Sequence, residues 1–216
     1  WVDEPNALVN VDSGAGEPMV PATTIEITDG LVVRSLSGIG DLPVTRDISR
    51  YDRAYRYADV LVVGSGLSGL AAAKKYADQG KIVIVMDDKP EVGGHANQCG
   101  EIIPAELLAT LTRENVTHIQ RTTVIGTYDQ GYAVAVERRT DHVSSKVSTD
   151  VARIRTWHVR AEHTVLATGA FQRPLVFANN DRPGIMLSHA AATYVERGVT
   201  KFKTAVVVTV DNQGYT

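Results

Sequence analysis

Three glycines with the spacing GxGxxG carry the clearest chemical signal in the sequence. Gly64, Gly66 and Gly69 follow the apolar run 59–63 and come before an alanine-rich stretch that is typical of a helix. The first glycine permits a sharp turn, the second lets the backbone approach a pyrophosphate, and the third lets the helix pack against the strand. Free N–H groups at the start of such a helix attract phosphate. The spacing predicts a dinucleotide-binding loop made of Gly64, Ser65, Gly66, Leu67, Ser68 and Gly69.

An acidic residue stands where this kind of site needs one. Asp87 lies 18 residues after Gly69, close to the spacing of about 20 that the motif requires. Its carboxylate can accept hydrogen bonds from an adenosine ribose, and its negative charge would repel a 2′-phosphate. Asp87 therefore favours NAD or FAD over NADP, although the nearby Lys89 weakens that argument. The alternative is a degenerate fold that has the same loop and binds nothing.

Two later features resemble one superfamily of flavoproteins. Gly93-Gly94 lies just beyond the second apolar run, where a second loop could approach the phosphates, and Ala167-Thr168-Gly169 ends a later run. The order GxGxxG, acid, double glycine, β-meander and Ala-Thr-Gly resembles the flavoproteins with two dinucleotide-binding domains. In that superfamily the first site favours FAD.

Buried parallel strands are expected around this loop. The continuous apolar runs 59–63 and 82–86 are typical of strands that are buried on both faces. The helix expected at 70–78 joins them into a parallel crossover unit, with Gly80 at its end. A helix is expected at 104–114, with a third strand at 117–120.

The hydrophobic period then changes. Residues 122–127, 132–138 and 151–159 predict three antiparallel strands, the first two joined by the turn 129–131. The run 163–168 returns to a buried strand of the parallel type. The expected fold class is therefore α/β: a Rossmann-like FAD/NAD(P)-binding domain whose parallel sheet carries an inserted antiparallel β-meander.

The chain divides into three expected zones. Residues 1–57 predict a small β-rich remnant, similar to the tail of a ferredoxin-like domain, that ends in a polar linker at 41–57. Residues 58–186 form the dinucleotide-binding domain. Residues 187–216 look like the truncated start of a second nucleotide-binding-type domain, so the chain is expected to be a piece of a longer polypeptide. The elements expected outside the central zone are strands at 7–11, 23–27, 31–34 and 205–210 and a helix at 187–198.

Composition excludes several other classes of function. The net charge of −3 gives no electrostatic footprint for nucleic acid, and the apolar runs are far too short for a membrane span. The single cysteine, Cys99, excludes an internal disulfide, a CxxC pair and an iron–sulfur site. The six histidines lack metal-ligand spacing. No residue is expected to be catalytic or to bind metal, and with no visible signal peptide the expected location is the cytoplasm.

Two segments closely resemble the alpha subunit of heterotetrameric sarcosine oxidase. They are ERRTDH at 137–142 and RPLVFANNDRPGIM at 173–186. The approach to the glycine loop, 50–64, and the short pieces 4–9 and 29–31 fit the same family. The resemblance spans nearly all of the chain, whereas the family's alpha subunit is several times longer.

The resemblance implies a subunit of an enzyme that demethylates sarcosine oxidatively to glycine, hydrogen peroxide and a one-carbon unit accepted by tetrahydrofolate. It implies a hetero-oligomer in which a beta subunit bears FAD, smaller subunits join, and an FMN sits at the alpha–beta interface. In the alpha subunit it implies a non-covalent NAD, which makes NAD the first choice here and FAD the alternative at the same site. By motif position, the implied contacts outside the first loop are Asp87, Asp88, Lys89, Gly94, His95 and Val124, beside Ala167, Thr168 and Gly169.

Two other interpretations stay open. One is an FAD- and NAD-dependent reductase of the pyridine-nucleotide-disulfide type, which would need a second GxGxxG after 205–210 and a CxxC pair. The other is a non-enzymatic scaffold with an empty pocket. Its motivation is that the segments 34–50 and 94–122 are shorter than the family pattern.

Overall fold

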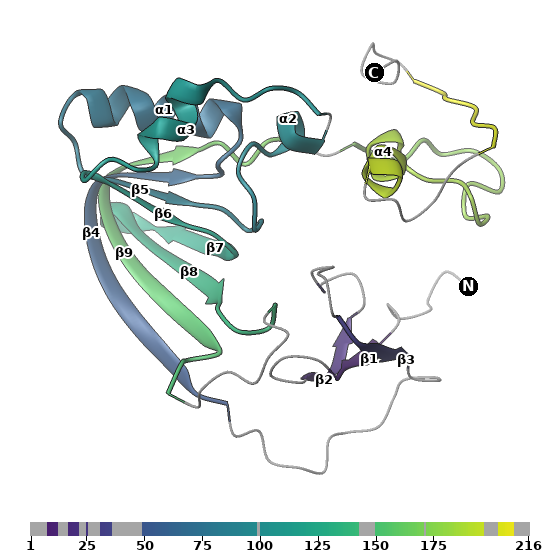
Figure 1. Cartoon of the computed structure of the whole chain (residues 1–216), viewed down its shortest axis with the longest axis horizontal. Coiled ribbons are helices and arrows are strands. Elements are labelled where there is room, and N and C mark those ends of the chain that lie inside the picture. Colours follow the sequence, from purple (N-terminus) through teal and green to yellow (C-terminus); the bar gives the residue numbers. More distant parts are fainter. Residues whose placement is uncertain are drawn as a thin grey trace. The chain divides into compact units, whose positions relative to one another are not determined.

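The chain forms a mixed α/β structure (Figure 1). Contacts within the chain define two compact units, of which unit 1 comprises residues 1–57 and 121–160 and unit 2 comprises residues 58–120 and 161–216. Strands β4 (Tyr51–Val63) and β9 (Ile154–Leu166) contribute to both units. This computed structural model describes residues 8–12, 17–21, 25, 31–35, 49–98, 100–142, 150–170, 172–196 and 203–209.

Unit 2 is built on a parallel βαβ crossover. The end of β4 pairs in parallel with β5 (Val83–Met86), and β5 pairs in parallel with β6 (Val116–Ile119). Helix α1 (Leu67–Asp78) makes the first crossover. All four side chains of β5 are buried, which explains why this run is continuously apolar. Along the chain, the short helices α2 (His95–Gln98) and α3 (Ala105–Thr110) follow β5 and precede β6.

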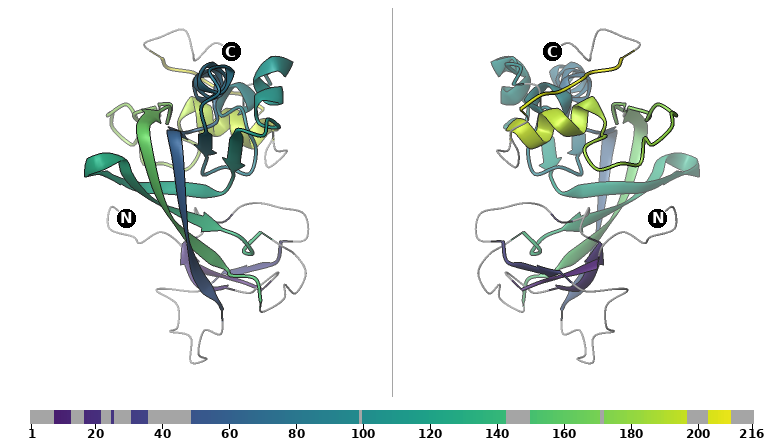
Figure 2. Two further views of the ribbon diagram at one scale, coloured as in Figure 1. Left: turned by 90° about the vertical axis from the view of Figure 1, so that its left-hand side faces the viewer. Right: turned by 90° about the vertical axis from the view of Figure 1, so that its right-hand side faces the viewer.

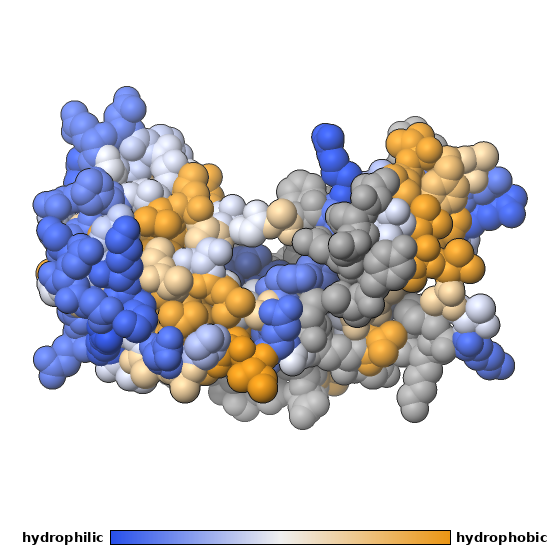
Figure 3. Space-filling model, turned by 90° about the horizontal axis from the view of Figure 1, so that it is seen from above, coloured by the Kyte–Doolittle hydropathy of each residue, from blue (hydrophilic) through white to orange (hydrophobic). Residues whose placement is uncertain are grey.

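The core of unit 2 lies between α1 and the parallel strands. Ala73 and Ala77 of α1 pack with Val60 and Val62 of β4 and with the valines of β5. Alanines at this spacing share one face of the helix and let it lie close to the strands. The exposed residues of α1 include Ser68, Lys75 and Asp78. Seen from above, the left-hand end of the surface in Figure 3 is mainly hydrophilic.

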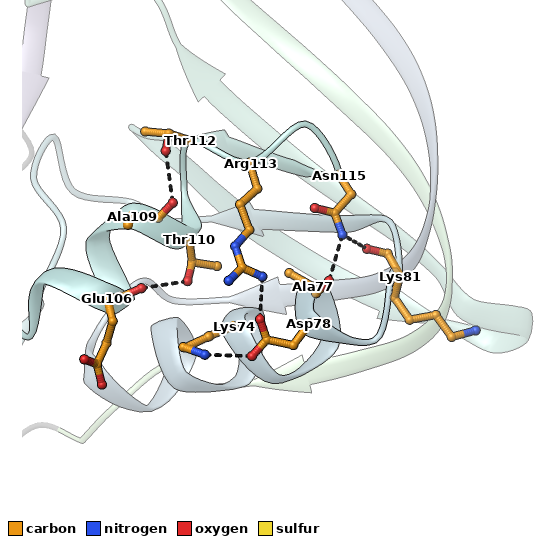
Figure 4. Close-up of polar contacts among 10 residues, drawn as sticks. All are labelled: Lys74, Ala77, Asp78, Lys81, Glu106, Ala109, Thr110, Thr112, Arg113 and Asn115. Carbon is orange, nitrogen blue, oxygen red and sulfur yellow. Dashed lines mark hydrogen bonds and ion pairs between the residues drawn. The ribbon is translucent and has the colours of Figure 1, made fainter.

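Polar contacts hold the end of α1 (Figure 4). The Asn115 side-chain amide donates to the carbonyl oxygens of Ala77, at 3.0 Å, and of Lys81, at 2.9 Å. Asp78 accepts hydrogen bonds from Lys74 and from Arg113, and both cations lower its pKa. Gly80 then turns the chain with φ of 75°, as its predicted place at the helix end requires.

Unit 1 contains the antiparallel strands. β7 (Thr122–Tyr128) pairs with β8 (Tyr132–Arg138), and β8 pairs with β9. The tight turn at Asp129–Gly131 places Gln130 and Gly131 at positive φ. Arg155 of β9 makes a bidentate ion pair with Asp52 of β4, both N–O distances being 2.8 Å, and this pair lowers the pKa of Asp52.

Two sheets result from these pairings. The larger has six strands in the order β6-β5-β4-β9-β8-β7, and β4 and β9 run side by side through it (Figures 1 and 2). The smaller joins β1 (Leu8–Val11), β2 (Glu17–Pro21) and β3 (Val33–Ser35) in the antiparallel order β2-β1-β3. The last helix is α4 (Ser188–Glu196). The predicted α/β class, with a parallel sheet and an antiparallel meander, is confirmed.

Several predicted element limits were wrong. β4 begins at Tyr51, within the segment 41–57 that was expected to be a polar linker. The charged residue Asp52 can lie in this strand because its carboxylate is paired with Arg155 of β9. The strands expected at 151–159 and 163–168 form the single strand β9. Residues 205–209 have no strand pairing in the structure, and β2 was not predicted. The strand expected at 23–27 and Cys99 lie outside the described residues, apart from residue 25.

Within the described ranges, no helix has the length and apolar character needed to cross a membrane. The same residues contain no group of three or more His, Cys, Asp or Glu side chains that could hold a metal ion.

Candidate dinucleotide-binding site

The loop between β4 and α1 begins with a glycine that no other residue can replace without strain. Gly64 has φ of 102°, and its N–H donates to the carbonyl oxygen of Met86 at 2.7 Å. A Cβ on Gly64 would lie 2.3 Å from the carbonyl oxygen of Ala167. The Ala-Thr-Gly stretch therefore lies directly against the start of the loop, and the Ala167 N–H donates to the carbonyl oxygen of Val63 at 2.8 Å.

The other two glycines of the motif have different roles. A Cβ on Gly69 would lie 1.9 Å from the carbonyl oxygen of Gly64, so Gly69 is required for the close packing of helix and loop. A Cβ on Gly66 would meet nothing nearer than the Gly93 carbonyl oxygen, at 4.0 Å. Gly66 is thus not required by the packing of the chain itself. The open space beside it is what a phosphate group approaching the backbone needs.

The N-terminus of α1 can receive an anion. Its N-cap, Gly66, supplies no side chain, and no acidic residue lies in the first turn. The Leu70 N–H donates to the carbonyl oxygen of Gly66 at 2.9 Å, so it is bonded within the helix. The N–H groups of Leu67, Ser68 and Gly69 precede it and have no partner inside the helix. Together with the positive end of the helix dipole, they favour a phosphate at this position.

The double glycine forms the second wall of this loop. The Gly93 N–H donates to the carbonyl oxygen of Ser65 at 2.9 Å, and Gly66 and Gly93 form a parallel bridge. Gly93 and Gly94 have φ of 108° and 54°. A Cβ on Gly94 would lie 3.2 Å from the Cα of Gly66. The two glycine-rich segments are therefore in backbone contact, although the paired residues Gly66 and Gly93 are 27 positions apart in sequence.

Asp87 is bonded to the chain itself. Its side chain is 8% exposed, and one carboxylate oxygen accepts hydrogen bonds from both the N–H and the hydroxyl of Ser65. The other oxygen accepts from the Lys89 N–H at 2.8 Å. The carboxylate thus fixes the glycine loop against the end of β5. Sequence reasoning missed this positioning role, for which the serine inside the motif was the available signal.

The next two side chains are more accessible than Asp87. The side chains of Asp88 and Lys89 are 53% and 57% exposed and form an ion pair with an N–O distance of 3.3 Å. They lie immediately after β5, on the same edge of the parallel sheet as the glycine loop. Asp88 is therefore better exposed than Asp87 for contact with a ribose.

A histidine that the sequence analysis did not include among the site residues lies next to Asp87. His118 of β6 pairs with Val85 of β5, and burial lowers its pKa while the Asp87 carboxylate opposes that effect. Its Nε2 atom is buried without a hydrogen-bond partner. The available signal was its position near the end of the third parallel strand, where ligands of such sheets bind.

His95 forms a histidine pair at the edge of the loop. It follows Gly94 directly, and its Nδ1 atom lies 2.7 Å from Nε2 of His189 in α4. The rings meet edge to face, and burial together with the nearby His95 lowers the pKa of His189. The Gln172 side chain accepts a hydrogen bond from the His189 N–H at 3.1 Å.

Unit 2 contains almost all of the predicted site residues. The glycine loop, the segment 87–89, the pair 94–95 and the stretch 167–169 all belong to it. Ala167 and the backbone nitrogen of Thr168 lie against the loop, and Thr168 and Gly169 are exposed to solvent. Val124 lies in β7, which belongs to unit 1.

A family model described as "FAD binding domain" matches residues 59–103, the part that holds β4, α1, β5 and both glycine segments. The chain is 42% identical over 229 aligned residues to the sarcosine oxidase subunit alpha of Corynebacterium sp. (strain U-96), and 35% identical over 225 to that of Rhizobium meliloti (strain 1021). These alignments cover 99% and 98% of this chain. The chain spans about a quarter of the length of these relatives, 24% and 23%.

Among solved structures, the L-proline dehydrogenase from P. horikoshii is similar in fold. The TM-score is 0.56 at 20% sequence identity, with 86% of this chain and 36% of that chain covered. At this identity the likeness concerns the fold alone. It agrees with the Rossmann-like α/β fold described above.

Proposed function

From the homology of this chain to sarcosine oxidase alpha subunits along nearly its whole length, we propose that it is the dinucleotide-binding part of a flavin oxidoreductase subunit. The observation that carries the proposal is the open space beside Gly66 at the N-terminus of α1. The other two motif glycines are needed by the fold. Gly66 is the one glycine of the three whose missing side chain leaves room for a ligand.

The residues present fit such a group. The N–H groups of Leu67, Ser68 and Gly69 would hold the pyrophosphate, and Gly94 would close the loop over it. Asp88 would accept hydrogen bonds from the adenosine ribose. Asp87 would act as a positioning residue, because its oxygens already accept hydrogen bonds from Ser65 and Lys89.

The identity of the dinucleotide is part of the proposal. The family-model match supports FAD, whereas the resemblance in sequence analysis put NAD first. Either ligand presents an adenosine and a pyrophosphate to the loop. When bound, FAD or NAD would supply a ring system that accepts a hydride equivalent, and no described residue of this chain is assigned a catalytic step.

The reaction of the whole protein is also proposed by homology. The relatives are named sarcosine oxidase subunit alpha, which favours the oxidative demethylation of sarcosine by an assembly with other subunits. In that assembly a flavin-bearing beta subunit would oxidise the amine, and the one-carbon unit would pass to tetrahydrofolate. This chain would contribute nucleotide binding and the scaffold around it.

Two glycine variants test the binding site. Gly66→Ala adds a methyl group to open space, so the free energy of unfolding should change by no more than about 1 kcal/mol. Bound dinucleotide, measured by mass spectrometry after denaturation, should fall at least tenfold. Gly69→Ala should instead destabilise the protein by about 1–3 kcal/mol, because the Cβ would overlap the Gly64 carbonyl oxygen.

A wild-type protein that releases no adenine dinucleotide on denaturation would overturn the proposal. So would a Gly66→Ala protein that keeps the wild-type content. The visible absorbance of the released ligand separates the two candidates, because FAD has a flavin band and NAD has none.

A further inference from the structure

The antiparallel strands of unit 1 have two chemically different faces. On one face Arg155 and Trp157 of β9 contact Asp52 and Glu137, so its cations and carboxylates neutralise one another. Alternate residues of a strand point to opposite faces, and the register of β8 and β9 places His158 and Arg160 on the other face.

A row of aromatic rings crosses the second face. The ring of Tyr55 in β4 stacks on His158 in β9, with centroids 4.8 Å apart. The Tyr132 ring of β8 lies 6.0 Å from the same imidazole, and its hydroxyl bonds to Nδ1 of His158. Tyr128 of β7 continues the row at 5.7 Å from Tyr132. Four rings on four strands thus form one ordered surface.

Positive charge accompanies these rings. The Arg160 guanidinium lies over the Tyr132 ring, 5.8 Å from its centroid, and Arg53 is exposed between Tyr51 and Tyr55 on β4. Among the described strand residues of unit 1, none on this face is Asp or Glu, although the whole chain has a net charge of −3. Glu162, two residues beyond Arg160 on β9, belongs to unit 2 and pairs with Lys81 at 4.0 Å. We refer to this surface as the tyrosine–arginine face and define it by Arg53, Tyr55, Tyr128, Tyr132, His158 and Arg160.

We propose that the tyrosine–arginine face is a docking surface for an acidic region of another protein subunit. Tyr and Arg are the residues most enriched at the energetic centres of protein interfaces. Tyr55 and Tyr128 are 63% and 59% exposed, while their neighbours hold the rings in place, so little conformational entropy is lost on binding. Cations that have no acidic strand neighbour on this face within unit 1 complement carboxylates on a partner.

A protein partner explains the ring geometry better than a nucleic acid does. Bases bind to free ring faces on such sheets. Here His158 covers one face of Tyr55, and Arg160 lies over Tyr132. The edges and hydroxyl groups that stay exposed are suited to side chains of another protein. The nature of the partner rests on the proposed function, which makes it a subunit of the same oxidoreductase assembly.

The first test uses the full-length protein that contains this chain, tagged and purified with its partner subunits. In the double variant Arg53→Glu, Arg160→Glu, co-purification of the flavin-bearing subunit should fall at least tenfold. The control Lys75→Glu, Lys203→Glu makes the same change in charge at two exposed lysines of unit 2 and should leave it unchanged. Equal recovery of the partner from both double variants would overturn the proposal.

The second test measures oxidation of tyrosine side chains by hydroxyl radicals. Tyr55 and Tyr128 should react several-fold more slowly in the assembly than in the isolated full-length subunit, whereas Tyr76 of α1 should react equally in both. Equal protection in the isolated subunit would mean that the same polypeptide covers the face, which contradicts the proposal. Binding of single-stranded oligo(dT) that the Arg→Glu variant abolishes would contradict it as well.

Failure of this inference is separable from failure of the proposed function. Dinucleotide released on denaturation of the isolated full-length subunit reports on the glycine loop, because the flavin-bearing subunit is then absent. An arginine variant whose isolated subunit keeps its dinucleotide, but which loses its partner, supports both proposals. A wild-type isolated subunit without dinucleotide, whose assembly still depends on Arg53 and Arg160, removes only the proposed function.

Discussion

At the scale of single residues, the site separates two neighbouring acids. Asp87 occupies the position where the motif places a ribose ligand, yet its carboxylate is buried and holds the backbone of Ser65 and Lys89. Asp88 is exposed at the same edge of the sheet. Spacing along the sequence identified this pair of positions. It did not reveal that Asp87 holds the loop while Asp88 is exposed.

Amide substitutions should separate these roles. In Asp87→Asn the side-chain NH₂ group faces an N–H donor, which loses a buried hydrogen bond and should destabilise the ligand-free protein by about 1–3 kcal/mol. Asp88→Asn should change stability by less than about 0.5 kcal/mol, since the ion pair of Asp88 with Lys89 is exposed to solvent. Urea unfolding of the two variants and their affinity for dinucleotide give the comparison. If Asp87→Asn binds dinucleotide more weakly without losing stability, Asp87 and not Asp88 is the residue that binds the ribose.

His118 should make the protein sensitive to acid. Burial lowers its pKa in the folded state, so at mildly acidic pH the unfolded chain binds more protons than the folded one. Stability should therefore fall as the pH drops below about 6.5, the ordinary value for histidine. Melting temperatures between pH 7.5 and pH 5 should show a smaller decrease for His118→Gln than for the wild type. The exposed control His163→Gln should keep the wild-type slope, and an unchanged slope in His118→Gln would contradict the assignment.

At the scale of elements, the local sequence pattern predicted which strands and helix surround the site, but not how long the strands are. Residues 60–62 and 83–86 are buried on both faces, so composition alone revealed the apolar runs that contain them. The start of β4 is exposed and carries charged residues, and it becomes a strand through pairing that involves β9, about one hundred residues later. Such pairing leaves no local signal, which is why 51–57 looked like a linker.

The end of α1 offers a test at this scale. Asn115 donates to the carbonyl oxygens of Ala77, in the last turn of α1, and of Lys81, which follows the helix. Asn115→Ala should lower the free energy of unfolding by about 1–3 kcal/mol, since the Lys81 carbonyl loses this hydrogen bond and that of Ala77 keeps only the one from the Gly80 N–H. Asn115→Asp should cost more, because a carboxylate would face the same carbonyl oxygens. Thermal unfolding of both variants decides the matter, and an aspartate variant as stable as the wild type would exclude this role.

At the scale of the whole molecule, both units share strands while the candidate ligand contacts lie mainly in unit 2. A ligand that binds only the folded state stabilises it according to its concentration. Dinucleotide at 100 times its dissociation constant should add about 2.7 kcal/mol, or about 5–10 °C in melting temperature for a chain of this size. Differential scanning fluorimetry with NAD, FAD and NADP measures this shift. No shift with NAD or FAD, in protein freed of bound ligand, would favour an empty scaffold.

The contact between Gly64 and Ala167 has a consequence for how the protein is made. These residues are 103 positions apart, yet the carbonyl of Ala167 lies where a side chain on Gly64 would be. A ribosome releases the glycine loop long before it has synthesised the strand that completes it. During that interval the loop lacks the neighbour that holds its first turn, and closing so long a segment costs entropy before any contact forms. Nucleotide binding during translation should therefore begin only after β9 has emerged from the ribosome. The synthesis of this strand is then the last step in the maturation of the site.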